Sequence, residues 1–463
     1  MKNVNFQSIS EFQLTYQNIN FLLLSLFFLF LTFSQNVFIL LFYKMSKFAV
    51  QYIDPVTDIT NQKSEFKLDG KAWRSNLKLL VDLKVANARV YSDLPGAYGL
   101  IRHIRLMSRG VELDSCRNAN YLMAFKNVNN ANEENIGIRS KLSNAKVGFQ
   151  IDEKLQFESR NVSTALDVAS VENKGSAVLH LNNILPLLNS VEVFNTEVFP
   201  ELRVVIEYNT DEKLKLTNTT DASTSNRPLL IAEEVSDPAM INASRGFKGV
   251  QWATMETDQT IIPAQAGAGV QSVVRKINGF DGKKVDRLVM MKHLFPISTN
   301  YTGAAAIGFG AYSSYVQNLE KINFNLNGKP IFPNSDGLKD SAEKAMLLSD
   351  TWGRVDLLPY GNQSGTGSVL GRTQNITGSA VYGVPRISGS DAAPRISERV
   401  GAMDYVGLSI ADQVQNLELV YERTCLGDTQ SHLPQNSSLE IRIFAEVRKQ
   451  MTTSNGNVAV SYV

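Results

Sequence analysis

The sequence predicts an all-β protein made of two tandem antiparallel β-sandwiches. Three observations predict this fold: strand-like alternation over most of the chain, one phrase that is written twice, and the length of 463 residues. A chain of this length exceeds one typical core and fits two domains of roughly 200 residues each. With 43% hydrophobic and 20% charged residues, the composition is that of an ordinary globular protein.

Apolar residues alternate with polar ones in three segments that we expect to be strands. The segment 75–85 reads SNLKLLVDLKV and places Leu77, Leu79 and Val81 on one face, and segments 201–209 and 439–447 alternate in the same way. A period of two with one apolar face is typical of an antiparallel sheet that packs on another layer.

The duplicated phrase is HIRLMSRGVELDS at 103–115 and KINFNLNGKPIFP at 321–333. The matching pairs Ile104/Ile322, Leu106/Phe324 and Gly110/Gly328 all lie 218 residues apart (322−104, 324−106, 328−110). Asn327-Gly328 favours a tight hairpin because a type I′ turn needs positive φ at both central residues, and Arg109-Gly110 is a weaker version. Helical spacing after each hairpin predicts short helices at 118–128 and 340–350.

The repeat divides the chain into two similar units. We expect a first unit at 49–240, a second at 245–450 and a C-terminal tail at 451–463. The closing strands match with Leu202 opposite Leu439, and their larger offset of 237 (439−202) predicts longer loops in the second unit. Two large antiparallel units with a few short helices favour two eight-stranded jelly-roll sandwiches.

The segment 1–44 is unlike the rest. Residues 19–43 carry no charge and are long enough to span a bilayer, but they fit a signal peptide poorly. Met45-Ser46-Lys47 reads like an ordinary start. Three interpretations stay open: a start at Met45, which makes 1–44 dispensable, a membrane anchor, or a buried apolar arm.

Neither the net charge nor the sequence motifs indicate a catalytic site or a binding site for a cofactor, a metal or nucleic acid. The formal net charge is +1 with no basic arm, so a dedicated nucleic-acid surface is not indicated. Cys116 and Cys425 lack a CxxC spacing, which argues against a disulfide framework or thiolate cluster. We expect no catalytic residue, no cofactor and no metal site. Three sets of residues are the candidates for such roles. The histidines His103, His180, His293 and His432 are scattered, and the glycines Gly365, Gly367 and Gly371 do not have the spacing of a phosphate-binding loop. We expect the tryptophans Trp73, Trp252 and Trp352 to pack in the core.

Four segments, 181–211, 227–238, 277–292 and 322–332, resemble double jelly-roll major capsid proteins of the adenovirus and tailless-phage lineage. The likeness is greatest to those of virophages and Polinton-like viruses and covers roughly 60–450. It implies pseudo-hexameric homotrimeric capsomers of an icosahedral shell, located in the virion and assembled inside the host cell. Implied partners are other copies of the chain and penton or minor capsid proteins at vertices, with an internal membrane left open and no sequence-specific nucleic-acid binding.

Two alternatives to a major capsid protein remain. One is a secreted or membrane-anchored double jelly-roll enzyme that acts on glycans, similar to an amidase, with acidic residues in the cleft between the sandwiches. The other is a minor capsid protein of the same fold. In the capsid interpretation, the Gly- and Ser-rich stretch 359–399 is expected to be an inserted loop that forms an outward projection or a contact between capsomers.

Overall fold

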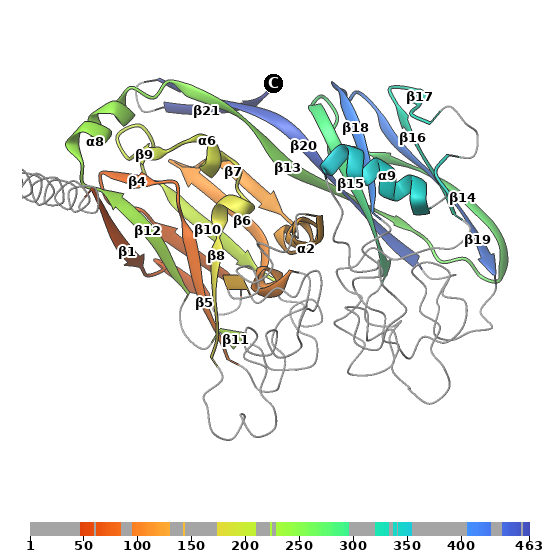
Figure 1. Cartoon of the computed structure of the whole chain (residues 1–463), viewed down its shortest axis with the longest axis horizontal. Helices are drawn as coiled ribbons and strands as arrows, with labels where there is room; N and C mark the ends of the chain where they lie inside the picture. The colour runs from red at the N-terminus through yellow and green to blue at the C-terminus, as the bar shows by residue number, and fades with distance from the viewer. Residues whose placement is uncertain are drawn as a thin grey trace, which may run out of the picture.

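Two β-sandwiches lie side by side in the computed structural model (Figure 1). The residues that the structure describes are 47–59, 62–84, 95–129, 142–143, 174–209, 223–224, 228–295, 320–332, 337–339, 341–353, 405–426, 438–454 and 457–463. No helix among them is long and apolar enough to cross a membrane. The segments 1–44 and 359–399, for which the sequence supports specific predictions, lie outside the described residues.

The first sandwich packs two sheets, A and B, face to face. Among the described residues, sheet A contains β1 (Phe48–Ile53), β4 (Ala72–Arg74), β5 (Lys78–Lys84), β8 (Lys174–His180), β9 (Val193–Asn195), β11 (Ser223–Thr224) and β12 (Leu229–Val235). Sheet B contains β2 (Thr57–Ile59), β3 (Lys63–Lys67), β6 (Ile101–Ser108), β7 (Val111–Arg117) and β10 (Arg203–Tyr208). Short helices join these strands: η1 (Gly96–Leu100), α2 (Ala119–Asn129), η2 (Leu181–Asn183) and α6 (Leu187–Ser190).

Helix α8 (Pro238–Arg245) leads into the second sandwich, which packs sheets C and D. In the described part of the chain, sheet C contains β13 (Gly249–Ile262), β15 (Lys284–Phe295), β18 (Val406–Gln413), β20 (Ser438–Ser454) and β21 (Asn457–Tyr462). Sheet D contains β14 (Ala268–Ile277), β16 (Glu320–Leu326), β17 (Lys329–Pro330) and β19 (Leu417–Leu426). Helix α9 (Ser341–Trp352) follows β17 in the sequence.

Both sandwiches have the same strand order. We number the eight core strands of each unit from 1 to 8 along the sequence. The spatial order of the strands is then 1-8-3-6 in sheet A (β1-β12-β5-β8) and in sheet C (β13-β20-β15-β18). It is 2-7-4-5 in sheets B (β3-β10-β6-β7) and D (β14-β19-β16-β17). All of these pairs are antiparallel, and two sheets of four strands with such crossovers form a jelly roll. The predicted all-β double jelly roll is therefore confirmed.

The duplicated phrase forms the hairpin between the fourth and fifth strands of each unit. Its turns are Arg109-Gly110, with φ of 46° and 80°, and Asn327-Gly328, with φ of 51° and 81°. Both central residues of each turn thus have the positive φ that a type I′ turn requires. Helices α2 and α9 begin after the two hairpins, as predicted, so the phrase marks equivalent positions in the two units.

The predicted match between Leu202 and Leu439 is wrong. Leu202 immediately precedes β10 in sheet B, whereas Leu439 lies in β20 of sheet C. Strand order equates β10 with β19, and their residues Val204 and Leu419 pair with the equivalent Leu106 and Phe324. Their offset is 215 (419−204), slightly less than 218, so the chain between the hairpin and this strand is not longer in total in the second unit.

The expected C-terminal tail from 451 is also wrong, because β20 continues to Ser454 and β21 pairs with it. Glu256 of β13 fixes β21 in place by accepting a hydrogen bond from Tyr462 and contacting Lys283 and Lys449. Burial alone would raise the pKa of Glu256. Lys449 and the hydrogen bonds outweigh burial, and the pKa lies below its ordinary value of 4.5.

We expect Glu256→Gln to lower the free energy of unfolding by about 1–3 kcal/mol at neutral pH, because a charged acceptor of several hydrogen bonds is lost. A lowered carboxyl pKa contributes stability above its unfolded-state value and loses it as the pH falls through its folded-state value. Urea unfolding should therefore show the difference from wild type shrinking below pH 4.5. A difference that is constant with pH would contradict this account. Asp286→Asn, which removes a more exposed ion pair with Arg448, is the control and should cost under about 1 kcal/mol.

Candidate functional site

The seam between the two sandwiches is an extension of the hydrophobic core. Along β15 and β20 of sheet C, Leu288, Met290 and Ile443 point into the second sandwich. Val289 and Phe444, at intervening positions, belong instead to the core cluster of the first sandwich. The outer face of sheet C therefore carries apolar residues that pack into the core of the first sandwich, beside polar residues such as Arg287, His293 and Arg442.

Helix α2 of the first sandwich supplies the aromatic contacts across the seam. The Tyr121 ring lies 4.7 Å from the His293 ring and beneath the guanidinium of Arg442, which is 3.8 Å from the ring centroid. The Phe125 ring meets those of Trp352 and Tyr405 edge-on, at centroid distances of 5.3 and 5.2 Å. Edge-to-face rings at these distances are favourable beyond the area that they bury, so α2 ties the units together.

A buried carboxylate crosses the seam near the aromatic residues. Asp114 of β7 accepts hydrogen bonds from the Thr254 hydroxyl of β13 at 2.8 Å and from the backbone N–H of Leu187 at 2.9 Å. Burial raises the pKa of Asp114, although these hydrogen bonds and nearby Lys449 lower it in part. Asp114 thus joins β7 and α6 of the first unit to β13 of the second, and these hydrogen bonds fix how the two units pack.

Trp352 at the end of α9 completes the seam. Its indole N–H donates to the Leu288 carbonyl at 3.0 Å, its own carbonyl accepts from the Asn129 side chain at 3.0 Å, and the Arg287 guanidinium lies 4.1 Å from its ring. Arg287 also contacts Glu446. Trp352 therefore packs between the two units.

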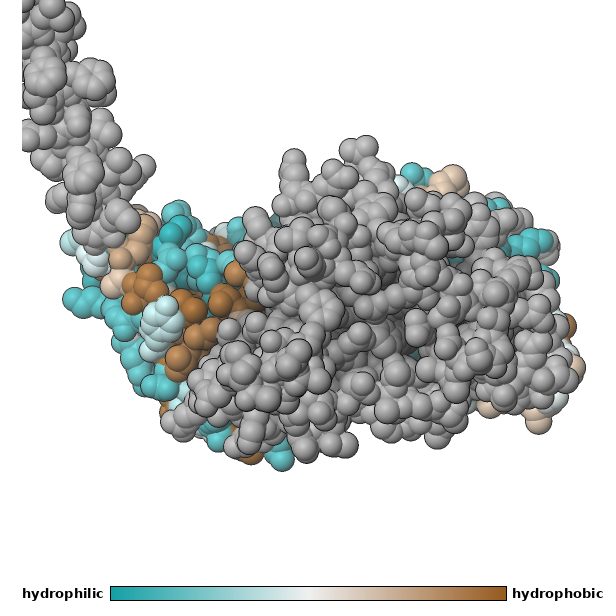
Figure 2. Space-filling model, turned by 60° about the horizontal axis from the view of Figure 1, so that its bottom comes forward, coloured by the Kyte–Doolittle hydropathy of each residue, from teal (hydrophilic) through white to brown (hydrophobic). Residues whose placement is uncertain are grey.

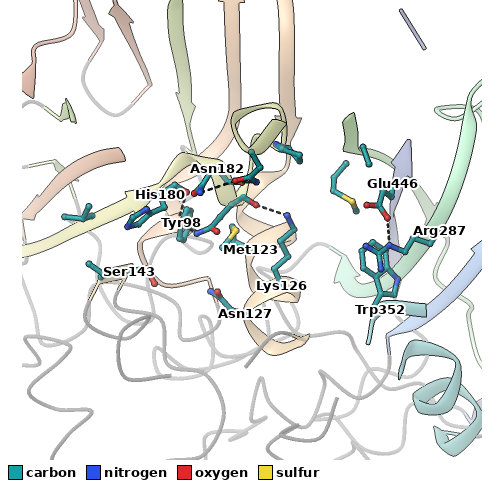
Figure 3. A pocket seen from close by; sticks show the side chains of 17 residues that line it. Tyr98, Met123, Lys126, Asn127, Ser143, His180, Asn182, Arg287, Trp352 and Glu446 are labelled. Carbon is teal, nitrogen blue, oxygen red and sulfur yellow. Dashed lines mark hydrogen bonds and ion pairs between the residues drawn. The ribbon is translucent and has the colours of Figure 1, made fainter. Parts of the chain in front are cut away.

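A cleft of 360 Å³ opens beside this seam (Figure 3). Lys126 and His180 lie on its first-sandwich side, and Arg287, Trp352 and Glu446 lie opposite. The Lys126 ammonium donates to the Asn183 carbonyl at 2.7 Å. Within the described lining Glu446 is the only carboxylate, and it contacts Arg287, so this lining does not supply the acidic residues that the enzyme alternative needs.

The residues that the sequence offered as candidates for a functional site do not come together in the structure. Trp73 and Trp252 are buried in the core cluster, which confirms their packing role. His103 lies in β6, 3.6 Å from Glu207, and His293 is buried in β15. The two free cysteines are buried, and burial raises the pKa of Cys116 to about 12. Among the described residues, no three His, Cys, Asp or Glu side chains lie close enough together to hold a metal ion. His432 and the glycines Gly365, Gly367 and Gly371 lie outside the described residues.

Sequence reasoning missed a buried ionic cluster inside the second sandwich. Lys292 of β15 and Lys344 of α9 both contact one carboxylate oxygen of Glu320, and the Tyr421 hydroxyl donates to the other oxygen at 2.9 Å. The side chains of the three charged residues are at most 2% exposed. The sequence does contain one sign of this cluster. Lys292 stands within the apolar run LVMMKHLF, and a strand of this kind buries both of its faces.

The strand order, the shared seam and the position of the helices define a protein class, the double jelly roll. Two solved structures have similar folds. They are the mavirus major capsid protein (9% identity, TM-score 0.54, covering 89% of this chain and 90% of that chain) and the PBCV-1 protein VP54 fitted into a reconstruction of the virophage Sputnik (11%, 0.52, 90% and 97%). No protein-family model and no curated protein sequence matches this chain. The resemblance to double jelly-roll major capsid proteins is therefore confirmed at the level of the fold.

Proposed function

We propose that the chain is the major capsid protein of an icosahedral virus and forms homotrimeric, pseudo-hexameric capsomers. The observation that carries this proposal is the repetition of one strand order in two units that share a buried seam. A six-coordinated lattice position can be filled by three identical chains if each supplies two similar units, since closed rotational symmetry needs only one repeated contact. The units proposed for the two corners are 49–240 and 245–450, the second extended through β20 and β21 to Tyr462.

The similar folds support this proposal, because one is named a major capsid protein and another was fitted into a virophage particle. The function is structural rather than enzymatic, and the protein resides in the virion. Its partners are further copies of itself and minor proteins at the vertices. The stretch 359–399 supplies an outward projection or a contact between capsomers, and 1–44 is dispensable for the capsomer.

The test is the mass of the purified protein in solution. Multi-angle light scattering at micromolar concentration should report three times the chain mass of 51.3 kDa, because the proposed contact closes after three copies. A stable monomer or dimer would contradict the proposal. Hydrolysis of a glycopeptide by that monomer would favour the enzyme alternative.

A further inference from the structure

The outer face of sheet A carries an apolar patch that lies outside the described cores. We call Val50, Tyr52, Leu80, Leu229 and Ile231 the sheet A patch. Tyr52 pairs with Ile231 and Leu80 pairs with Leu229, so these residues share the face opposite to the buried Leu79 and Leu230. Val50 is 59% exposed and Tyr52 is 61% exposed. Hydrophobic residues are visible at the surface of the first sandwich, at the left of the view in Figure 2.

The equivalent face in the second sandwich is covered within the chain. Sheet C has the same 1-8-3-6 strand order as sheet A, and its outward Val289 and Phe444 pack into the core cluster that contains Tyr121 and Phe125 of α2. Sheets A and C thus both carry apolar residues on their outer faces. One of them has a cover in the described chain, and that cover comes from the neighbouring unit.

The 2-7-4-5 sheet of the first sandwich shows the opposite pattern on its outer face. There, Arg203 pairs with Glu65 at 2.7 Å and Arg105 pairs with Glu207 at 2.6 Å across neighbouring strands. Rows of half-exposed ion pairs are suited to water, whereas a contiguous apolar patch marks an interaction surface. In the first sandwich, the apolar outer residues therefore gather on sheet A rather than on sheet B.

The element equivalent to α2 has a face that is exposed among the described residues. Helix α9 follows the fifth strand of its unit as α2 does, and Glu343, Met346 and Asp350 lie three and four residues apart on one exposed side. Met346 is 56% exposed. Lys78, which pairs with Ile231 among the apolar residues, complements the two carboxylates. Glu233 lies opposite Val50 on the same face, and its charge is paired with Arg74 at 2.8 Å.

We propose that α9 of a second copy of this chain covers the sheet A patch, repeating between chains the contact that α2 makes with sheet C within the chain. The inference rests on the proposed function, since it names the surfaces that hold the trimer together. The proposed contact is heterologous, with different surfaces on the two partners, and a rotation of about 120° at each contact closes three copies into a ring that leaves neither surface free.

A pair of charge-introducing double variants tests the contact. Val50→Glu/Tyr52→Glu should convert the trimer to a monomer at micromolar concentration, a threefold fall in mass by light scattering. Val270→Glu/Val274→Glu is the matched control because these residues are 62% and 56% exposed on the outer face of sheet D. This control should remain trimeric. A trimeric Val50→Glu/Tyr52→Glu variant beside a trimeric wild type would overturn this contact and leave the proposed function standing, whereas a monomeric wild type would overturn both.

Mixing identifies which two surfaces meet. Met346→Glu should also be a monomer, with a melting temperature close to that of the Val50→Glu/Tyr52→Glu monomer because all three positions are exposed. An equimolar mixture of the two variants retains one intact α9 face and one intact sheet A patch, and it should give a 1:1 dimer that cannot close. Failure to form this dimer, or self-association of either variant alone, would show that the two surfaces do not bind each other.

Discussion

Replacing Glu320 by Gln is expected to lower the free energy of unfolding by about 3–5 kcal/mol, because removing one partner from a buried ion pair leaves uncompensated charge in the core. Lys292 and Lys344 would lose the carboxylate that both contact, at a site where the side chains of all three are at most 2% exposed. Equilibrium unfolding in urea, monitored by tryptophan fluorescence and circular dichroism, measures the loss.

The matched control for this variant lies on the opposite face of the same two strands. Lys321 of β16 pairs with Glu422 of β19 at 3.0 Å, and their side chains are 43% and 33% exposed. Glu422→Gln should therefore cost under about 1 kcal/mol. If the two variants lose the same amount of stability, burial of the Glu320 cluster is not what makes it important.

Phe125→Ala is expected to cost about 3–5 kcal/mol and to uncouple the two sandwiches. Phe125 is 1% exposed and meets both Trp352 and Tyr405, so its loss leaves a cavity at the seam. The wild-type protein should unfold in one calorimetric transition, because one core cluster spans both units. The variant should show two transitions.

Phe324→Ala is the control for uncoupling. Phe324 is fully buried within the core of the second sandwich, away from the seam. The Phe324→Ala variant should lose a comparable amount of stability, because the substitution weakens the second sandwich directly. It should not open the seam between the units. A single transition at lower temperature for Phe125→Ala would mean that the seam does not depend on this ring.

Apart from the fold class, the parts of the fold that the sequence predicted correctly are local. The Asn327-Gly328 turn and the helices that follow the two hairpins depend on residues a few positions apart, and both were predicted correctly. Alternation reports that a strand has an apolar face, but it does not report which strand lies beside it. Leu202 and Leu439 were matched for that reason, although β10 and β20 lie in different sheets.

The buried polar groups could not be predicted because their partners are distant in the sequence. Asp114 bonds Thr254 across 140 residues, and Tyr421 bonds Glu320 across 101 residues. In the sequence Asp114 reads as an ordinary polar position of a strand. Its burial follows from the docking of the second sandwich, which brings β13 against β7.

The most direct test of the capsomer account is electron cryomicroscopy of the purified protein. Class averages should show particles with three-fold symmetry and a six-sided outline, in which six similar sandwiches surround the axis and each sheet A faces the α9 of a neighbouring chain. Single two-lobed particles, or rings with a symmetry other than three-fold, would contradict the account.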